Sequence, residues 1–278
     1  MPPRNPNTTD HSNQSTPAAL DFYGKALAAL ADAGIPFLVG GGYAVHVYTG
    51  IARMTKDFDL FVLPEDVSRV LQTLAAAGYH TELTYPHWLA KVYSGKEVID
   101  VIFSSGNGMC RVDQGWFEHA TDAVVLNLAV KVCPPEESIW QKAFIMERDR
   151  FDGADIAHLL RVRAGTLDWP RLLERFGPHW RVLFMHLVMF GFIYSDEQTL
   201  IPAWVMHELL DRFREQVDHP PQADHVCRGT LFSREQYQID VEAWGYQDPR
   251  LTPLGRMTAT DLAKWTPVAG NGEQAKRE

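Results

Sequence analysis

The sequence predicts an α/β (α+β) fold, in which helices flank a mixed β-sheet and a helical region follows it. Over residues 17–165, short apolar runs typical of strands alternate with helical patterns, and some strands follow one another closely. Glycines and prolines mark the ends of several of these runs. Residues 169–214 are rich in Leu, Phe, Met and Trp at helical spacing, which predicts the C-terminal helical addition.

The first elements are placed by the residues that bound them. Apolar residues recur at helical spacing over residues 17–33, and Gly34 follows, so we expect a helix there. A strand over residues 37–39 then ends at three consecutive glycines, residues 40–42. The amphipathic segment 43–48 follows, which places the glycines at a strand-to-helix turn.

The next segment alternates strands with a helix. We expect a strand over residues 57–63 and a helix over residues 64–77, started by Pro64 and stopped by Gly78. Further short strands are expected over residues 79–83, 89–93 and 98–103.

The second half of the chain is predicted to be mostly helical. Residues 123–132 supply one or two peripheral strands, and helices are expected over residues 136–147 and 152–163. Residues 169–214 continue with helical spacing, whereas residues 227–250 show no clear period.

These patterns predict an α/β domain over residues 17–165 and a mostly helical domain over residues 166–264. The polar segments 1–16 and 265–278 are expected to be disordered tails. Residues 1–16 also lack the apolar core of a secretion signal.

Composition narrows the class of protein. Hydrophobic content of 46% and charged content of 22% are ordinary for a globular protein. The net charge of −9 argues against a dedicated nucleic-acid binder, although it leaves a nucleic-acid acceptor open. Cys110, Cys133 and Cys227 have no disulfide or metal spacing, so we expect a reducing cytoplasm. No apolar run approaches the ~20 residues of a membrane span, so no membrane partner is expected.

Two carboxylates occupy alternate positions of the predicted strand 57–63. Asp57 and Asp59 share one face of that strand, while Phe58 and Leu60 point to the core. Like charges this close repel, and a hard divalent cation relieves the repulsion because carboxylate oxygens are its preferred ligands. The alternative is a pair of solvated surface acids.

A third acid and the glycine turn extend this pattern. Asp100 interrupts an otherwise apolar strand, where an unpartnered carboxylate is costly. A metal shared with Asp57 and Asp59 would supply its partner, and three acids can hold two Mg²⁺ ions about 3.5–4 Å apart. Gly40, Gly41 and Gly42 expose backbone N–H groups at a helix start, which suits a phosphate or simply close packing.

At these residues the chain resembles the nucleotidyltransferase superfamily, which includes polymerase β-like enzymes, antibiotic nucleotidyltransferases and AbiEii/MenT-type toxins. The superfamily pattern is matched by Val39-Gly40-Gly41-Gly42, Asp57-Phe58-Asp59 and Asp100. Motifs of the toxin-like branch are matched by Gly41-Gly42-Tyr43-Ala44, by Arg53-Met54-Thr55-Lys56-Asp57, and by Lys142 with the Arg/Asp-rich segment 148–155. The resemblance covers residues 37–161.

The resemblance implies a nucleotidyltransferase core that transfers NMP from an NTP to an acceptor hydroxyl and releases pyrophosphate. It implies two Mg²⁺ ions, with Mn²⁺ as an alternative, held by Asp57, Asp59 and Asp100. The implied nucleotide-binding residues are Gly40, Gly41, Gly42, Arg53, Thr55 and Lys142. A small molecule, a tRNA end or a protein hydroxyl would each be compatible as acceptor.

Several alternatives stay open at this point. A catalytically silent nucleotide-binding or toxin–antitoxin-type interaction module would carry the same motifs, and the same metal site could hydrolyse phosphoesters. Lys142 could extend its charge from an apolar helix face to solvent, and Asp152 could cap a helix. The oligomeric state is not indicated by any pattern.

Overall fold

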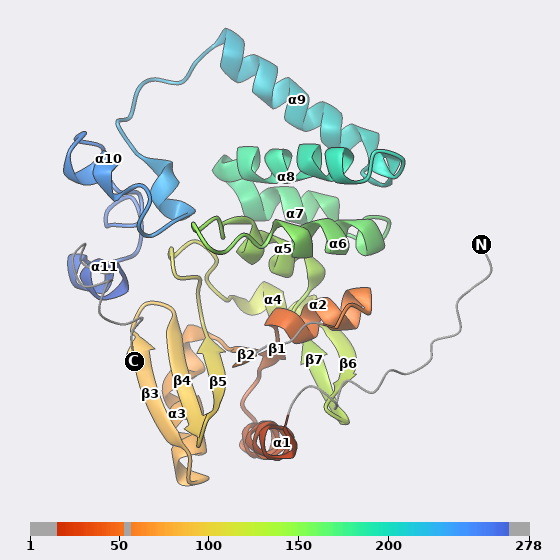
Figure 1. The fold of residues 1–278 in the computed structure, drawn as a ribbon, viewed down its shortest axis with the longest axis vertical. Coiled ribbons are helices and arrows are strands. Elements are labelled where there is room, and N and C mark those ends of the chain that lie inside the picture. Colours follow the sequence, from red (N-terminus) through yellow and green to blue (C-terminus); the bar gives the residue numbers. More distant parts are fainter. Residues whose placement is uncertain (1–15, 53–56, 267–278) are drawn as a thin grey trace.

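The computed structural model describes residues 16–52 and 57–266. Its centre is a seven-stranded mixed sheet with the strand order β3-β4-β5-β2-β1-β7-β6 (Figure 1). The strands are β1 Leu38–Val39, β2 Asp57–Phe61, β3 His80–Tyr85, β4 Leu89–Ser94, β5 Glu97–Ile102, β6 Thr121–Val125 and β7 Leu128–Val132. The predicted fold class is therefore confirmed.

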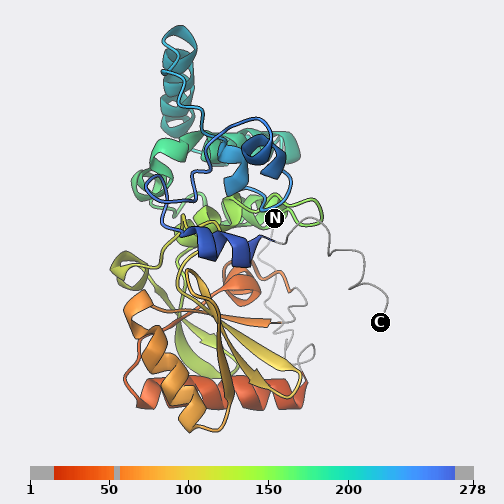
Figure 2. The same ribbon diagram turned by 90° about the vertical axis from the view of Figure 1, so that its left-hand side faces the viewer.

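Helices cover the sheet and continue beyond it. The helices are α1 Pro17–Asp32, α2 Gly41–Thr49, α3 Val67–Ala76, α4 Gln114–Glu118, α5 Pro135–Ala143, α6 Gly153–Arg163, α7 Trp169–Phe176, α8 Trp180–Ile193, α9 Ala203–Asp218, α10 Gln238–Glu242 and α11 Ala259–Trp265. Helices α1 and α3 pack together against the sheet, whereas α2 lies between the sheet and α5 and α6 (Figures 1 and 2). Helices α7, α8 and α9 confirm the predicted helical spacing, and they stack successively beyond α5 and α6.

The predicted boundaries hold within a few residues for α1, β1 to β5 and α3. The helix predicted over residues 136–147 is too long, because α5 ends at Ala143. There the backbone N–H of Met146 donates to the carbonyl of Phe232 at 3.2 Å instead of continuing the helix. A contact with the C-terminal segment thus overrides local helical spacing.

The strands predicted over residues 123–132 are the β6–β7 hairpin of residues 121–132, whose turn places Leu126 and Asn127 at positive φ. The prediction that these strands are peripheral is right for β6 and wrong for β7. Strand β7 pairs in parallel with β1, with Val39 opposite Val132, so only β6 lies at the edge. This long-range parallel pairing leaves no local sequence signal.

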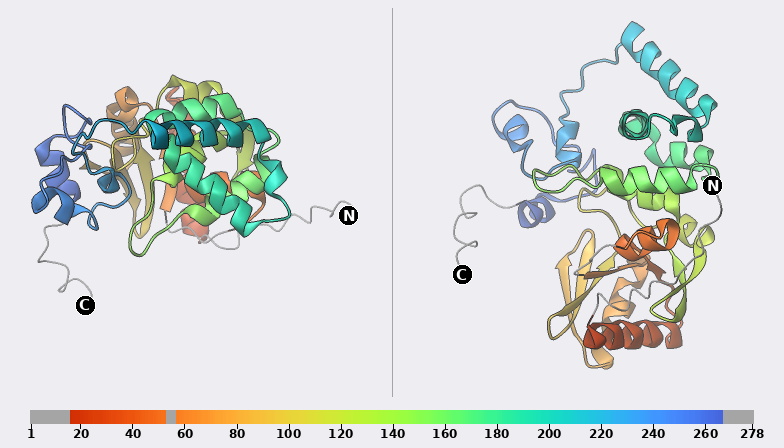
Figure 3. Two further views of the ribbon diagram at one scale, coloured as in Figure 1. Left: turned by 90° about the horizontal axis from the view of Figure 1, so that it is seen from above. Right: turned by 45° about the vertical axis from the view of Figure 1, so that its right-hand side comes forward.

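Three residues assigned to the tails by composition, Thr16, Trp265 and Thr266, are ordered. The side chain of Thr16 caps α1 by accepting a hydrogen bond from the N–H of Ala19 at 3.1 Å. Trp265 is the last residue of α11, which lies beside the β3–β4 end of the sheet (Figure 3). The remaining tail residues lie outside the described parts of the chain.

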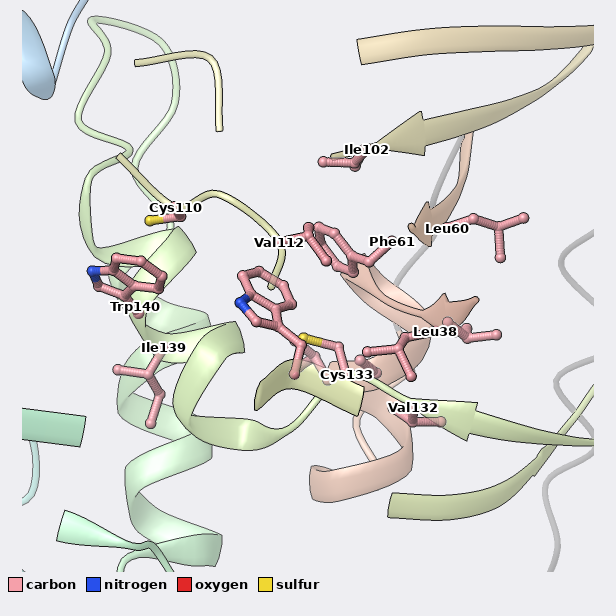
Figure 4. Packing of buried hydrophobic residues seen from close by; sticks show 14 of the residues in the cluster. Leu38, Leu60, Phe61, Ile102, Cys110, Val112, Val132, Cys133, Ile139 and Trp140 are labelled. Atoms are coloured by element: carbon pink, nitrogen blue, oxygen red, sulfur yellow. The ribbon is translucent and has the colours of Figure 1, made fainter. Parts of the chain in front are cut away.

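One continuous hydrophobic core joins the sheet to the helices. Phe61 of β2 lies next to Val112, whereas Leu60 points to the opposite face of the sheet, and Ile139 and Trp140 of α5 belong to the same cluster (Figure 4). Leu60 and Ile139 are completely buried. Because α5 is packed against the same core as β2, the polar face of α5 is held in a fixed position relative to the acids of β2.

Candidate active site

Asp59 and Asp100 lie side by side on two central strands. Strands β2 and β5 run parallel, and Asp59 is the register partner of Asp100, whereas Asp57 is opposite Val98. Residues directly opposite in neighbouring strands project from the same face. On the other face of β2, Phe58 is fully buried and stacks on an α1 ring. The alternation predicted for residues 57–61 is therefore confirmed.

The neighbouring carboxylates strain each other electrostatically. Burial, followed by the negative charge of Asp100, raises the pKa of Asp59 to about 7, although the nearby Lys142 charge opposes this shift. Burial also raises the pKa of Asp100, despite a hydrogen bond from Lys91. Keeping both carboxylates ionised costs free energy, so a divalent cation bound between them would be stabilised by their negative charge.

Lys91 provides a positive charge at this site. Strand β4 is antiparallel to β5, and Lys91 is the register partner of Asp100. Its Nζ donates to Oδ1 of Asp100 at 2.7 Å. Sequence reasoning missed Lys91. The predicted strand 89–93 contains this residue, but the sequence does not show that it pairs with Asp100.

The acids only partly form the predicted metal site. Within residues 16–52 and 57–266, no group of three His, Cys, Asp or Glu side chains lies close enough to hold a metal ion. Asp59 and Asp100 nevertheless fit a hard divalent cation, because they are adjacent carboxylates whose shared charge is unfavourable. The role of Asp57 as a further ligand stays a prediction.

The glycine turn lies directly against this acid pair. Helix α2 begins at Gly41, which has φ +53°, and a Cβ there would lie 1.6 Å from Oδ2 of Asp59. A Cβ at Gly40 would lie 2.0 Å from the Phe61 ring, and the Gly40 N–H donates to the Asp59 carbonyl at 2.9 Å. Close packing is therefore one role of both glycines, and it places the start of α2 next to the Asp59 carboxylate.

A pocket of about 610 Å³ opens beside these residues. Its inner lining includes Gly41, Gly42, Asp59 and Asp100, and Lys142 of α5 contributes a charge. Further lining residues come from the segment after α5 and from the C-terminal segment. Five of the predicted site residues therefore line one cavity, whereas Gly40 and Asp57 are not part of its lining.

Lys142 belongs to an ion cluster in this pocket. Its Nζ lies 2.9 Å from Asp152 and 2.8 Å from Asp155, and its side chain is only 11% exposed. The interpretation of Lys142 as extending to solvent is therefore wrong. Asp152 precedes α6, but within the described residues its side chain binds Lys142 and Arg150 and makes no capping hydrogen bond.

Residues 230–234 and Trp265, from the C-terminal part of the chain, form one wall of the pocket. The Trp265 ring packs edge-on against Trp88 with centroids 5.0 Å apart, and the Arg234 guanidinium lies 5.0 Å from the Trp265 centroid. A Cβ at Gly106 would lie 2.4 Å from the Trp265 ring. The loop after β5 and helix α11 are thus packed together at the wall of the pocket.

Comparison with known families identifies the class of the protein. The model of a family described as uncharacterised nucleotidyltransferases matches residues 13–182. The chain belongs to this nucleotidyltransferase family. The predicted resemblance is confirmed, and the enzyme class with it. A search of curated proteins finds no match.

Solved structures resemble this nucleotidyltransferase only distantly. The antibiotic-resistance factor ANT(2'')-Ia is 18% identical over 73% of this chain and 96% of its own, with a TM-score of 0.37. The lincosamide antibiotic adenylyltransferase LnuA is 16% identical over 54% of this chain and 99% of its own, with a TM-score of 0.39. A nucleotidyltransferase-like protein from Paracoccidioides brasiliensis is 16% identical over 69% of this chain and 98% of its own, with a TM-score of 0.45.

Two predicted nucleotide contacts of the nucleotidyltransferase, Arg53 and Thr55, lie outside the described residues. Sequence reasoning missed the pocket wall made by Trp88, Arg234 and Trp265, because these residues come from distant segments without a shared motif.

None of the described helices is long and apolar enough to cross a membrane.

Replacing Gly41 of the nucleotidyltransferase with Ala should displace the Asp59 carboxylate. The new Cβ would overlap Oδ2 of Asp59 and would sit at a positive φ, so we expect a loss of about 1–3 kcal/mol of stability and at least about tenfold of activity. Urea unfolding and pyrophosphate release measure the two effects. The matched control is Gly24→Ala within α1, where a Cβ meets no described atom within 4 Å, so activity should be kept and stability should rise by up to about 1 kcal/mol because Ala favours the helix. Equal behaviour of the two variants would contradict the proposed crowding at Gly41.

Proposed function

We propose that this nucleotidyltransferase transfers NMP from an NTP to an acceptor hydroxyl in a metal-dependent reaction that releases pyrophosphate. One observation carries the proposal: Asp59 and Asp100 are register partners on adjacent strands, and the start of α2 lies against Asp59. Carboxylates next to a helix N-terminus combine the ligands that a divalent cation prefers with the N–H groups that a phosphate prefers.

The chemistry is a displacement at the α-phosphorus. The acceptor oxygen forms a bond to this phosphorus, while the bond from phosphorus to the oxygen bridging to the β-phosphate breaks. Pyrophosphate leaves with that bonding electron pair, and the hydroxyl proton passes to Asp100. Mg²⁺ or Mn²⁺, held by Asp57, Asp59 and Asp100, would neutralise charge on the attacking and leaving oxygens.

The remaining residues position the triphosphate. The backbone N–H groups of Gly40, Gly41 and Gly42 at the start of α2 would bind phosphate oxygens. Lys142 lines the same pocket, and its ammonium would exchange its ion pairs with Asp152 and Asp155 for a phosphate oxygen. Arg53 and Thr55 would contribute a guanidinium and a hydroxyl. These groups act by orientation and charge neutralisation.

The proposal also covers the kind of acceptor and the cellular compartment in which the protein acts. The pocket volume of about 610 Å³ is of the size that holds a small molecule, and a tRNA end or a protein side chain would be the other acceptors to test. Cys110, Cys133 and Cys227 are free thiols, which suits the reducing cytoplasm.

The test incubates the purified protein with each α-labelled NTP in the presence of Mg²⁺, Mn²⁺ or excess EDTA. Total tRNA, cell lysate and an aminoglycoside panel serve as acceptors in separate reactions. We expect label transfer and pyrophosphate release with metal, and a loss of at least about 10²-fold with EDTA. Label in one fraction alone would identify the acceptor class.

Three other outcomes have distinct meanings. NTP binding by calorimetry without turnover would support the catalytically silent module. Release of hydrolysed nucleotide without transfer would support phosphoester hydrolysis. Undiminished transfer in EDTA would overturn the metal dependence.

A further inference from the structure

Four neighbouring strands carry charged residues at one level of the sheet. Across β3, β4, β5 and β2, the register partners are Glu82, Lys91, Asp100 and Asp59. Residues in such a row project from the same face. Lys91 therefore lies between two acids, next to the pair proposed to bind metal.

Lys91 makes its contact with Asp100. The Nζ–Oδ1 distance is 2.7 Å, and the two side chains are 23% and 14% exposed. On the other flank, Glu82 is exposed and accepts a hydrogen bond from the Tyr93 hydroxyl at 3.3 Å. The Lys91 ammonium is thus directed toward the active-site acid and neutralises part of its charge.

We propose that Lys91 is a positioning residue that competes with a divalent cation for Asp100. This inference rests on the proposed function, because it assumes that Asp59 and Asp100 hold metal. A carboxylate oxygen that accepts a hydrogen bond from an ammonium must release or share it before it can coordinate a cation. Asp59 has no such internal cation in contact among the described residues, so Asp100 is the conditional ligand of the pair.

The competition sets the order in which the two acids coordinate a divalent cation. Asp59 would coordinate the cation first. Asp100 would coordinate it with both oxygens only after the Lys91 ammonium has moved away. A salt bridge with a purely structural role predicts a different result. Its removal would lower stability and would leave the affinity for metal unchanged or weaker.

The experiment measures Mn²⁺ binding to the full chain without nucleotide, by electron paramagnetic resonance of free Mn²⁺ and by calorimetry. Lys91→Met keeps the aliphatic stem and removes the charge, so we expect about three- to tenfold tighter Mn²⁺ binding than in the unchanged chain. Lys91→Arg keeps the charge and should bind Mn²⁺ as the unchanged chain does. Lys91→Gln is a second neutral variant, used if the Met variant does not fold by circular dichroism.

The matched control is Lys131→Met. Lys131 also lies on a strand and pairs with an Asp, at 3.2 Å, but it is on β7 and 52% exposed. Its replacement should leave Mn²⁺ binding unchanged. Equal tightening in both Lys→Met variants would show a general charge effect and would overturn the assignment to Lys91.

Asp59→Asn in the same titration separates the two proposals. If Mn²⁺ binding depends on Asp59 but folded neutral variants of Lys91 bind no more tightly, the Lys91 inference alone is wrong. If no Mn²⁺ binding depends on Asp59 in any variant, the proposed metal site fails, and the Lys91 inference fails with it.

Discussion

Replacing Asp59 with Asn should reduce NMP transfer by at least about 10³-fold. The substitution removes a charged oxygen from the acid pair, and such sites act mainly by preorganised charge neutralisation. Asn has nearly the same shape, so the Gly41 contact and the strand are kept. Pyrophosphate release under saturating NTP and Mg²⁺ measures the loss. Turnover within tenfold of the unchanged enzyme would reject Asp59 as a metal ligand.

A control of the same chemistry is available on β6. Asp122 is 88% exposed and pairs with Lys131, so Asp122→Asn should leave turnover unchanged.

The effect of Asp59→Asn on the free energy of unfolding depends on pH. Because the pKa of Asp59 is raised from 3.8 to about 7 in the folded protein, the fold loses stability as the pH rises between these two values and the loss is complete above about 7. The metal-free Asn variant should therefore gain stability over the unchanged protein at pH 8 and not at pH 4.

Replacing Glu137 with Ala should destabilise the fold by about 3–5 kcal/mol. Glu137 is completely buried on α5 and forms ion pairs with Arg171 and Arg175 of α7. Arg175 also binds Asp113 at 2.6 Å, which extends the network to the segment before α4. Removing the carboxylate leaves two guanidinium groups with less compensation in a partly buried position. Urea unfolding followed by circular dichroism measures the free energy of unfolding.

Glu174→Ala on α7 is the matched control. Glu174 is exposed, so its replacement should change the free energy of unfolding by less than about 0.5 kcal/mol. A loss below about 1 kcal/mol for Glu137→Ala would show that this network contributes little. The sequence indicated only that acids suit the first turn of this helix, and the structure adds that Glu137 binds arginines of another helix.

Local patterns predicted the parts of the fold that local chemistry determines. The alternation of Asp57, Phe58 and Asp59 fixed both the strand and the face of its acids. Gly40 to Gly42 placed the start of α2, because only glycine tolerates the approach of Asp59 and Phe61. Asp100 was found because a charge in an apolar strand requires a partner.

Features that depend on pairing between distant segments were not predictable. The register of Lys91 with Asp100 is set by the antiparallel β4–β5 pairing, and one residue of slip would turn Lys91 to the other face. Lys142 forms ion pairs with Asp152 and Asp155, which follow it after α5 has ended at Ala143. Beyond that end, the Met146 N–H donates to the carbonyl of Phe232, a residue far away in the sequence. Arg53 and Thr55 remain predictions.

The contact between Trp265 and the loop that follows β5 places the wall of the cavity and its acids on different parts of the chain. Gly106 accommodates the indole, so the rim of the cavity is supplied by a chain segment that contributes nothing to the sheet. Substitutions in that segment can reshape the rim while the acids on the central strands stay in place. Specificity for a ligand can therefore be changed at this loop and at α11 alone, because loop residues tolerate change while a rigid scaffold positions them.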